Sequence, residues 1–287
     1  MTEERKRFVI VGGNFAGLTA AIKFSRRHAV TVIDPSRHFE WAPGIHEILS
    51  SVKTPQGLRL DRAAIVKQAG HRCLRNPVTV LQPAQRRLAA AGGRELEFDA
   101  SIVAVRALWN THHIPGVARH AMPFRGVADG LAIEQRLDTL VREGKPLRIV
   151  IAGGSISGIE ALGEILRRHR DDAGLSVELV EACARLLPGL PTSLDADLRR
   201  LCEPYAVKFG TATTIASVSA KGVRLAEGSG CAPSLRCGRP GWLRQRCCAI
   251  RALRRHPGSG RTCTPRCRVV ISTTPSSSAT RRSWRKP

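Results

Sequence analysis

The chain lacks several features that would place it in common protein classes. It has no run of about 18 apolar residues, so no segment is predicted to cross a membrane as a helix. No secretory signal is visible, because residues 1–7 are charged and the following apolar run is interrupted by Gly12 and Gly13. Residues 1–228 also lack the dense cysteines of a disulfide scaffold, so we expect a reduced, cytoplasmic protein. The three cysteines of that part are Cys73, Cys183 and Cys202.

Acidic residues are absent from residues 229–287, which carry 14 Lys and Arg and six of the nine cysteines. The formal net charge of the whole chain is +23. With 32 basic and 23 acidic residues, residues 1–228 carry only +9. A strongly basic chain ordinarily binds nucleic acid or an anionic membrane, but here much of the excess lies at the end. The length of 287 residues allows two domains with separate cores.

Two segments about 140 residues apart share one glycine pattern. Each contains a short apolar run, a glycine cluster and a helical pattern, as in a buried parallel strand that turns into a helix. Such a turn directs backbone N–H groups and the positive end of the helix dipole at a pyrophosphate. The dinucleotide fingerprint has three glycines, whereas the middle position here holds another small residue. The three positions are Gly12, Asn14 and Gly17 in the first copy, and Gly153, Ser155 and Gly158 in the second.

An acidic residue ends the next strand after each glycine segment. Asp34 follows Gly12 by 22 residues, and Glu181 follows Gly153 by 28. Such an acid accepts hydrogen bonds from ribose hydroxyls; the alternative is that each one only ends a strand. Glu181 would also repel a 2′-phosphate, which favours NADH over NADPH.

These repeats predict an α/β protein with two Rossmann-like dinucleotide-binding domains, and two bound dinucleotides suggest an electron relay. We expect strand, helix and strand at 8–11, 15–27 and 30–33, and again at 148–152, 156–169 and 175–180. The expected domains are residues 1–116 and 117–228, followed by an aberrant basic tail without regular structure at 229–287. The predicted dinucleotide contacts are Gly12, Gly13, Asn14, Phe15, Ala16, Gly17 and Asp34 in the first domain, and Gly153, Gly154, Ser155, Gly158 and Glu181 in the second.

On these motifs the chain resembles the FAD-dependent pyridine nucleotide oxidoreductases, and within them the type II NADH dehydrogenase and apoptosis-inducing-factor-like branch. The resemblance covers residues 7–228. It implies an FAD-binding domain into which an NAD(P)H-binding domain is inserted, and hydride transfer from NADH to flavin and on to a quinone or similar acceptor. It also implies peripheral contact with the inner face of the membrane and no specific nucleic acid. The matching segments are residues 10–18, 31–34, 158–161, 179–181 and 185–188.

The resemblance also points to individual side chains. Residues 38–47 contain no cysteine, which excludes the dithiol relay that some relatives carry there. Pro43, His46 and Glu47 fall in the stretch that lies beside the flavin in relatives, although an ordinary surface position is the simpler interpretation of His46. Glu160 stands where the branch has a catalytic acid facing the nicotinamide; its alternative role is to complement the dipole of a helix.

Two further features stand outside this pattern. Arg106 follows the strand predicted at 98–105, where relatives have small residues close to FAD; it would either crowd the cofactor or reach a phosphate. His112 and His113 are adjacent, and adjacent histidines without a third ligand are typical of a loop, so we predict no metal site.

Three interpretations of residues 229–287 remain open. A basic nucleic-acid-binding arm agrees with the charge, but only Trp242 and Trp284 are available for stacking. A cysteine-rich metal site would need CxxC pairs, which are missing. A shifted reading frame near residue 229 would explain both deficits, because codons read one base early recover segments in the order found in relatives. Those segments include a hydrophobic strand and the Gly-Asp that holds the ribityl chain of FAD. The alternatives to an enzyme are thus a catalytically incompetent dinucleotide-binding fragment and a basic nucleic-acid-interacting protein.

Overall fold

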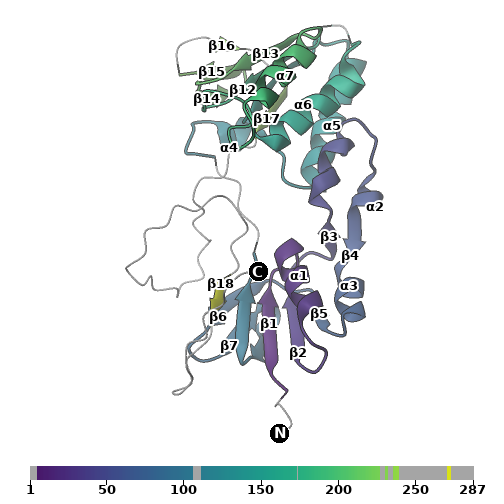
Figure 1. Ribbon diagram of the computed structural model, residues 1–287, viewed down its shortest axis with the longest axis vertical. Helices are drawn as coiled ribbons and strands as arrows, with labels where there is room; N and C mark the ends of the chain where they lie inside the picture. The colour runs from purple at the N-terminus through teal and green to yellow at the C-terminus, as the bar shows by residue number, and fades with distance from the viewer. Residues whose placement is uncertain are drawn as a thin grey trace. The chain divides into compact units, whose positions relative to one another are not determined.

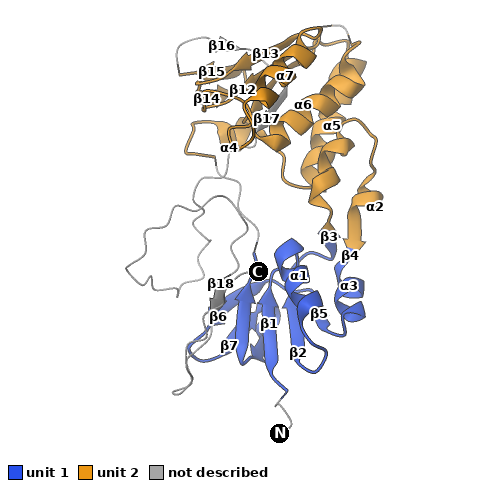
Figure 2. Ribbon diagram, viewed as in Figure 1, with its two compact units in different colours: residues 1–39, 61–107, 246–287 blue, residues 40–60, 108–245 orange. Residues whose placement is uncertain are grey.

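The protein divides into two compact units in the computed structural model, which describes residues 5–105, 111–172, 174–226, 230–231, 235–238 and 270–272. Unit 1 comprises residues 1–39, 61–107 and 246–287, and unit 2 comprises residues 40–60 and 108–245 (Figure 2). Each unit contains one five-stranded sheet whose central strands are parallel. The predicted α/β fold with two dinucleotide-binding sheets is therefore confirmed. Residues 40–60, which we expected in the first domain, group instead with unit 2.

The five-stranded sheet of unit 1 has the order β18-β9-β1-β2-β5. The pairs β1–β2, β1–β9 and β2–β5 are parallel, so the carboxyl ends of these strands lie at one edge. The described part of the unit also contains a three-stranded antiparallel sheet, β6-β7-β8, and the helices α1, α3 and η2 (Figure 1). The bounds are β1 Arg7–Val11, α1 Phe15–Lys23, β2 Ala29–Ile33, α3 Arg62–Gln68, β5 Arg72–Leu74, β6 Val78–Gln82, β7 Arg87–Ala90, η2 Ala91–Gly93, β8 Arg94–Glu97, β9 Ala100–Val103 and β18 Val270–Ser272.

Strand β1 is buried on both faces. Ile10 packs in one cluster with Val66 of α3, whereas Val9 and Val11 pack in another with Leu88 of the antiparallel sheet. A strand covered on both sides reads as a continuous apolar run instead of an alternating one. That burial explains why the sequence predicted this strand correctly.

The five-stranded sheet of unit 2 has the order β10-β17-β11-β12-β13, with every neighbouring pair parallel. The helices α5, α6 and α7 pack with this sheet in one apolar cluster (Figure 1). A second, antiparallel sheet of the same unit has the order β14-β15-β16. The bounds are α4 Val117–His120, β10 Met122–Pro123, α5 Val127–Arg142, β11 Arg148–Ala152, α6 Ile156–His169, β12 Ser176–Val180, α7 Ser193–Cys202, β13 Val207–Gly210, β14 Ile215–Ser219, β15 Gly222–Leu225, β16 Gly230–Cys231 and β17 Leu235–Gly238.

Residues 40–60 join unit 2 through apolar packing. The 3₁₀ helix η1 (Ala42–Ile48) and the short helix α2 (Pro55–Leu58) contribute Ile45, Ile48 and Leu58 to the cluster that contains Leu137 of α5. Flanking them, β3 (His38–Glu40) and β4 (Arg59–Asp61) form a two-stranded sheet, and the division between the units falls within both strands. The stretch that we expected beside a flavin is therefore anchored to the helices of unit 2.

Three short strands lie within residues 229–287, where we expected no regular structure. They are β16, β17 and β18, and β17 takes a central place in the sheet of unit 2. The rest of that expectation concerns residues outside the described part, as does the prediction for Arg106. In the described part of the chain, no helix combines the length and the apolar character needed to span a bilayer.

Candidate functional site

The first glycine segment forms an elbow between β1 and α1. Gly12 has a φ of +100°, and its N–H donates to the carbonyl oxygen of Ile33 at 2.8 Å. A Cβ atom at Gly12 would lie 2.4 Å from the carbonyl oxygen of Ala104, and one at Gly17 would lie 1.8 Å from the carbonyl oxygen of Gly12. Both glycines are required, one by the backbone turn and the other by the close approach of helix to strand.

The middle position of the fingerprint tolerates Asn14 and Ser155 because neither has a left-handed backbone. Asn14 has φ −99° and ψ −164°, and Ser155 has φ −76° and ψ 175°, so both are extended residues that precede a helix. Neither side chain makes a capping hydrogen bond to its helix. The first-turn N–H groups of α1 and α6 therefore have no partner from their own N-cap side chains.

Asp34 ends β2 and binds the elbow of unit 1. Its Oδ2 accepts the N–H of Gly13 at 2.8 Å, and its Oδ1 accepts the N–H of Ser36 at 2.8 Å. Arg62 donates from Nη1 to the same Oδ1 at 2.7 Å. The acid predicted from spacing thus has a structural role in the loop, in addition to any contact with a ribose.

Sequence analysis missed Arg62, which is only 4 % exposed. The residue begins α3 and donates from Nε to the carbonyl oxygen of Gly13 at 2.6 Å. A Cβ atom at Gly13 would lie 2.3 Å from the Cδ of Arg62, so the arginine covers the elbow directly. No spacing rule links residues 49 positions apart, and the only local signal was the Asp61-Arg62 pair at a helix start.

The second glycine segment repeats the same geometry in unit 2. Gly153 has a φ of +108°, and its N–H donates to the carbonyl oxygen of Val180 at 2.8 Å. A Cβ atom at Gly158 would lie 1.9 Å from the carbonyl oxygen of Gly153. Glu181 takes the place of the acid, because its Oε2 accepts the N–H of Gly154 at 2.7 Å. The two elbows are therefore equivalent strand-to-helix corners in two separate parallel sheets.

Phe15 and Ala16 are the remaining predicted contacts of the first elbow. They form the first turn of α1, with Phe15 packed edge-on against Phe39 at a centroid distance of 4.8 Å. Their side chains help to build the core of unit 1. A contact with a bound molecule would therefore come from the backbone of this turn.

Two candidates that were selected separately, His46 and Glu160, lie together in unit 2. His46 of η1 has its Nδ1 3.6 Å from the Oε2 of Glu160, the fifth residue of α6. The His46 side chain is 20 % exposed and that of Glu160 is 38 % exposed, so both side chains are partly buried and partly accessible to solvent. Pro43 is exposed at the start of η1, and Glu47 is half-buried near its end.

The cysteines are not arranged for redox or metal chemistry in the described residues. Cys73, Cys183 and Cys202 are free thiols. Burial raises the pKa of Cys73 and of Cys202, and the hydrogen bond with Glu181 raises that of Cys183, so none is biased toward the thiolate. His112 and His113 have φ angles of +50° and +57° within a loop. No group of three or more potential metal ligands gathers in the part of the chain that the structure describes.

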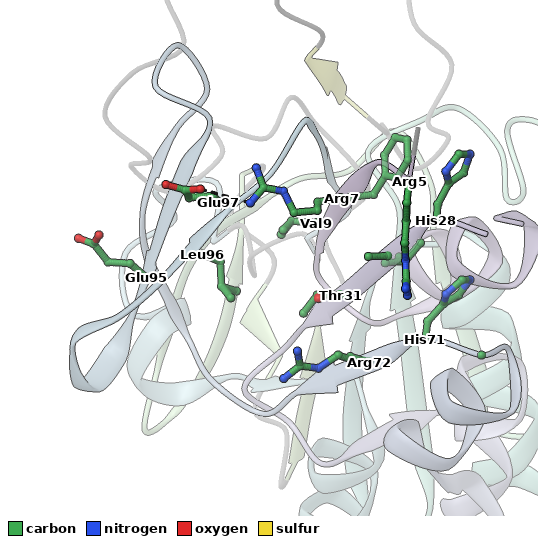
Figure 3. Close-up of a pocket in the computed structure, with 14 residues that line it drawn as sticks. Arg5, Arg7, Val9, His28, Thr31, His71, Arg72, Glu95, Leu96 and Glu97 are labelled. Carbon is green, nitrogen blue, oxygen red and sulfur yellow. Dashed lines mark hydrogen bonds and ion pairs between the residues drawn. The ribbon is translucent and has the colours of Figure 1, made fainter. Parts of the chain in front are cut away.

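A cavity of about 340 Å³ lies at the opposite edge of the unit 1 sheet. The starts of β1, β2 and β5 line it, with Arg7, Thr31 and Arg72 among the side chains that surround it in Figure 3. Arg7 forms an ion pair with Glu97 there at 3.2 Å. Because Gly12 and Asp34 stand at the carboxyl ends of the strands, this cavity is separate from the elbow.

Comparison with known proteins agrees with this geometry. The chain is 21 % identical to demethylphylloquinone reductase NdbB of Synechocystis over 78 % of its length and 58 % of that protein. It is 22 % identical to the type II NADH:quinone oxidoreductase of Staphylococcus epidermidis, over 77 % of the chain and 60 % of the relative. It therefore spans about 60 % of the length of these curated relatives.

Solved structures show the same fold. The structure of NDH2 from Plasmodium falciparum in complex with NADH matches with a TM-score of 0.76 at 17 % identity, over 83 % of this chain and 55 % of that one. The sulfide:quinone oxidoreductase of Aquifex aeolicus matches with a TM-score of 0.72 at 13 % identity, over 83 % and 59 %. Residues 6–232 match the family described as pyridine nucleotide-disulphide oxidoreductase, so the two elbows belong to a chain that is a member of that family.

Proposed function

We propose that the protein is an FAD-dependent NAD(P)H oxidoreductase that passes hydride from NADH to flavin and on to a quinone or a similar acceptor. One observation carries the proposal: a left-handed glycine, a close helix glycine and an acid that accepts the elbow N–H recur in both parallel sheets. Membership of the family supports the two cofactors. The relatives that reduce quinones support the acceptor.

The residues present fit an adenosine diphosphate group at each elbow. The N-cap side chains of α1 and α6 make no capping hydrogen bond, so they do not compete with a pyrophosphate for the backbone donors of these turns. The Oδ1 of Asn14 is buried and has no hydrogen-bond partner in the described structure. We assign FAD to Gly12, Gly13, Asn14, Gly17 and Asp34 in unit 1. NADH is assigned to the residues at the corresponding places in unit 2, which are Gly153, Gly154, Ser155, Gly158 and Glu181.

The protein's own residues would orient the cofactors and the acceptor. Flavin supplies the ring that accepts hydride and returns electrons singly or in pairs. Glu160 is proposed to face the nicotinamide, with His46 at 3.6 Å able to hold or release a proton at its Nδ1. Pro43 and Glu47 on η1 would lie near the same part of the nicotinamide site as Glu160, because η1 and α6 belong to one unit and one apolar cluster.

Location follows the acceptor. A quinone dissolved in a bilayer requires an enzyme that reaches the membrane surface, and we propose peripheral contact at the cytoplasmic face. The names of the curated relatives support a quinone as acceptor.

The test is cofactor binding by the purified full chain and by two elbow variants. Titration with FAD, followed by quenching of flavin fluorescence, is expected to show saturable binding, as is titration with NADH. G12A is expected to abolish FAD binding and to spare NADH binding, whereas G153A should do the reverse. G92A serves as a control, because Gly92 also has a positive φ but a Cβ there would meet nothing within 4 Å.

A dinucleotide-binding fragment without turnover is the second candidate. The observation that favours it is the length of the match, since the chain covers only about 60 % of its curated relatives. Binding of both dinucleotides without NADH oxidation in the presence of a soluble quinone would support the fragment. A chain that binds neither dinucleotide would refute both candidates.

A further inference from the structure

Arg62 occupies an unusual position for a cation. Among the residues whose burial is described, it is the only lysine or arginine that is buried. A guanidinium removed from water is costly unless its donors are satisfied. Arg62 meets this requirement with the carbonyl oxygens of Gly13, Ser36 and His38 and with the carboxylate of Asp34. Every one of these partners belongs to the elbow or to the chain that leaves β2.

These bonds hold Arg62 in place. Its Nε donates at 2.6 Å to Gly13 and its Nη2 at 2.7 Å to His38, while Nη1 serves both Ser36 and Asp34. At least four of the five guanidinium donors are then engaged. A side chain held in this way cannot swing out to bind a phosphate, so its effect on a ligand must be exerted through Asp34 and the elbow.

The hydrogen bonds of Asp34 leave one carboxylate oxygen able to accept a further hydrogen bond. Its Oδ1 accepts from both Ser36 and Arg62, which uses the two lone pairs of that oxygen. Among the described residues, its Oδ2 accepts only the N–H of Gly13, so it retains one lone pair toward them. The arrangement therefore presents a single acceptor, Oδ2, next to the elbow.

The acid in unit 2 is held differently. Glu181 accepts the N–H of Gly154 on Oε2 and that of Cys183 on Oε1, and its carboxylate also forms a hydrogen bond with the Cys183 thiol. No cation among the described residues lies within ion-pairing distance of it. The place over the elbow is taken by Leu186, whose Cδ2 would lie 2.9 Å from a Cβ at Gly154. One elbow is covered by a charged group and the other by an apolar one.

We infer that Arg62 is a positioning residue for the adenosine ribose in unit 1. It fixes Asp34 so that Oδ2 meets a ribose hydroxyl, and it neutralises that carboxylate before the ligand arrives. This inference rests on the proposed function, because it takes the ligand of unit 1 to be the adenosine half of FAD. In unit 2 the carboxylate of Glu181 has no ion pair among the described residues, and we infer that it discriminates against an added phosphate.

The test compares FAD affinities of R62Q, R62K, D34N and the double variant R62Q/D34N. R62Q is expected to weaken FAD binding about 10- to 100-fold, the effect of losing a hydrogen bond to a charged group. R62K keeps the positive charge but lacks the planar guanidinium and its several donors, so its FAD affinity should lie between those of the wild type and R62Q. The double variant should bind FAD with about the same affinity as the single variant that binds it more weakly, because both substitutions remove the same Arg62–Asp34 interaction. R72Q removes an exposed arginine of the same unit and should leave the affinity unchanged.

A merely structural arginine would give another pattern. Effects of R62Q and D34N that add in the double variant, or an unchanged affinity in R62Q, would overturn the inference. NADH affinity should not change in any of these variants, which controls for general unfolding.

Failure of the proposed function would be seen separately, as wild-type protein that takes up no FAD. In that case hydrogen exchange at the Gly13 amide, which donates to Asp34, decides the role of Arg62. Exchange about 10-fold faster in R62Q than in R72Q would support the inference that Arg62 holds Asp34 and the elbow in place. Equal rates would overturn it.

Discussion

At the scale of single residues, the two elbows of this chain make the same kinds of contact, although their sequences differ. The third glycine of each approaches the first so closely that an added Cβ would lie 1.8 or 1.9 Å from its carbonyl oxygen. Asp34 and Glu181 both accept an elbow N–H, although one is an aspartate and the other a glutamate. The agreement shows that the constraint comes from the strand-to-helix corner itself and not from the surrounding sequence.

Two glycines of α6 should respond to alanine in opposite ways. Gly158 faces β11 and leaves no space for a Cβ, whereas a Cβ at Gly163 would meet nothing within 4 Å. We expect G163A to raise the free energy of unfolding by about 0.5–1 kcal/mol, because alanine restricts the unfolded chain. G158A should lower it by about 1–3 kcal/mol or more through overpacking. Urea unfolding followed by circular dichroism measures both, and similar shifts for the two variants would contradict the assigned packing.

Asp195 should make the stability of unit 2 dependent on acid. Its hydrogen bond with Arg199, and then the N–H of Leu186, hold its pKa below the usual value for an aspartate. A lowered pKa in the folded state means that the stabilisation is present at neutral pH and is lost as the pH falls through the folded pKa. We therefore expect D195N to be less stable than wild type at pH 7 and to lose that difference in acid. Thermal unfolding across the acid range measures it; a difference that grows toward low pH would refute this assignment.

At the scale of elements, the packing of residues 40–60 on α5 and α6 was not visible in the sequence. Ile48 packs directly on α5, since a Cβ at Gly130 would lie in ordinary van der Waals contact with the Cβ of Ile48, at 3.4 Å. Polar contacts reinforce the attachment, as Ser50 donates to Glu164, a residue that is only 8 % exposed. Segment 40–60 is thus part of unit 2 although it lies between two stretches of unit 1.

Truncation of Ile48 should test this attachment. The side chain is 1 % exposed, so I48A leaves a cavity and is expected to cost about 2–5 kcal/mol in the unfolding free energy. V52A, at a residue that is 50 % exposed, is the matched control and should change stability by less than about 0.5 kcal/mol. NADH affinity should fall together with stability in I48A. Equal stability of the two variants would show that η1 is not part of the core of unit 2.

The elbows were predictable because their signals are local. A strand, three fingerprint positions and an acid lie within about 30 residues, and each position has its own steric or electrostatic reason. Arg62 was not predictable, since its partner Gly13 is 49 residues away and nothing in the intervening sequence connects them. The end of the first helix was also misplaced: α1 stops at Lys23 because Phe24 turns to an extended backbone and packs on Phe8 at 4.5 Å.

At the scale of the whole molecule, the sheet of unit 2 takes a strand from residues 229–287, for which a shifted reading frame is one interpretation. β17 lies between β10 and β11, with Leu235 paired to Ile149 and Cys237 to Ile151. Central parallel strands normally read as continuous apolar runs, but this one contains Arg236. The backbone position is therefore that of a central strand, whereas the sequence is not typical of one.

Restoring the frame should consequently improve both units. One nucleotide inserted just ahead of the codon for Ser229 makes the following codons read one base early, so that residues 237–242 can encode Leu-Trp-Thr-Ala-Gly-Val and the serines at 276–278, where encoded by TCN, become apolar residues. It also recovers the Gly-Asp that holds the ribityl chain in relatives. We expect the restored protein to bind FAD at least about 10-fold more tightly, the effect of one additional good contact, and to unfold at higher temperature. An insertion of three nucleotides at the same place keeps the present frame and should change neither property. A restored protein with the same affinity and melting temperature as the present chain would reject the frame hypothesis, and the basic segment would then have to be explained by its own charge.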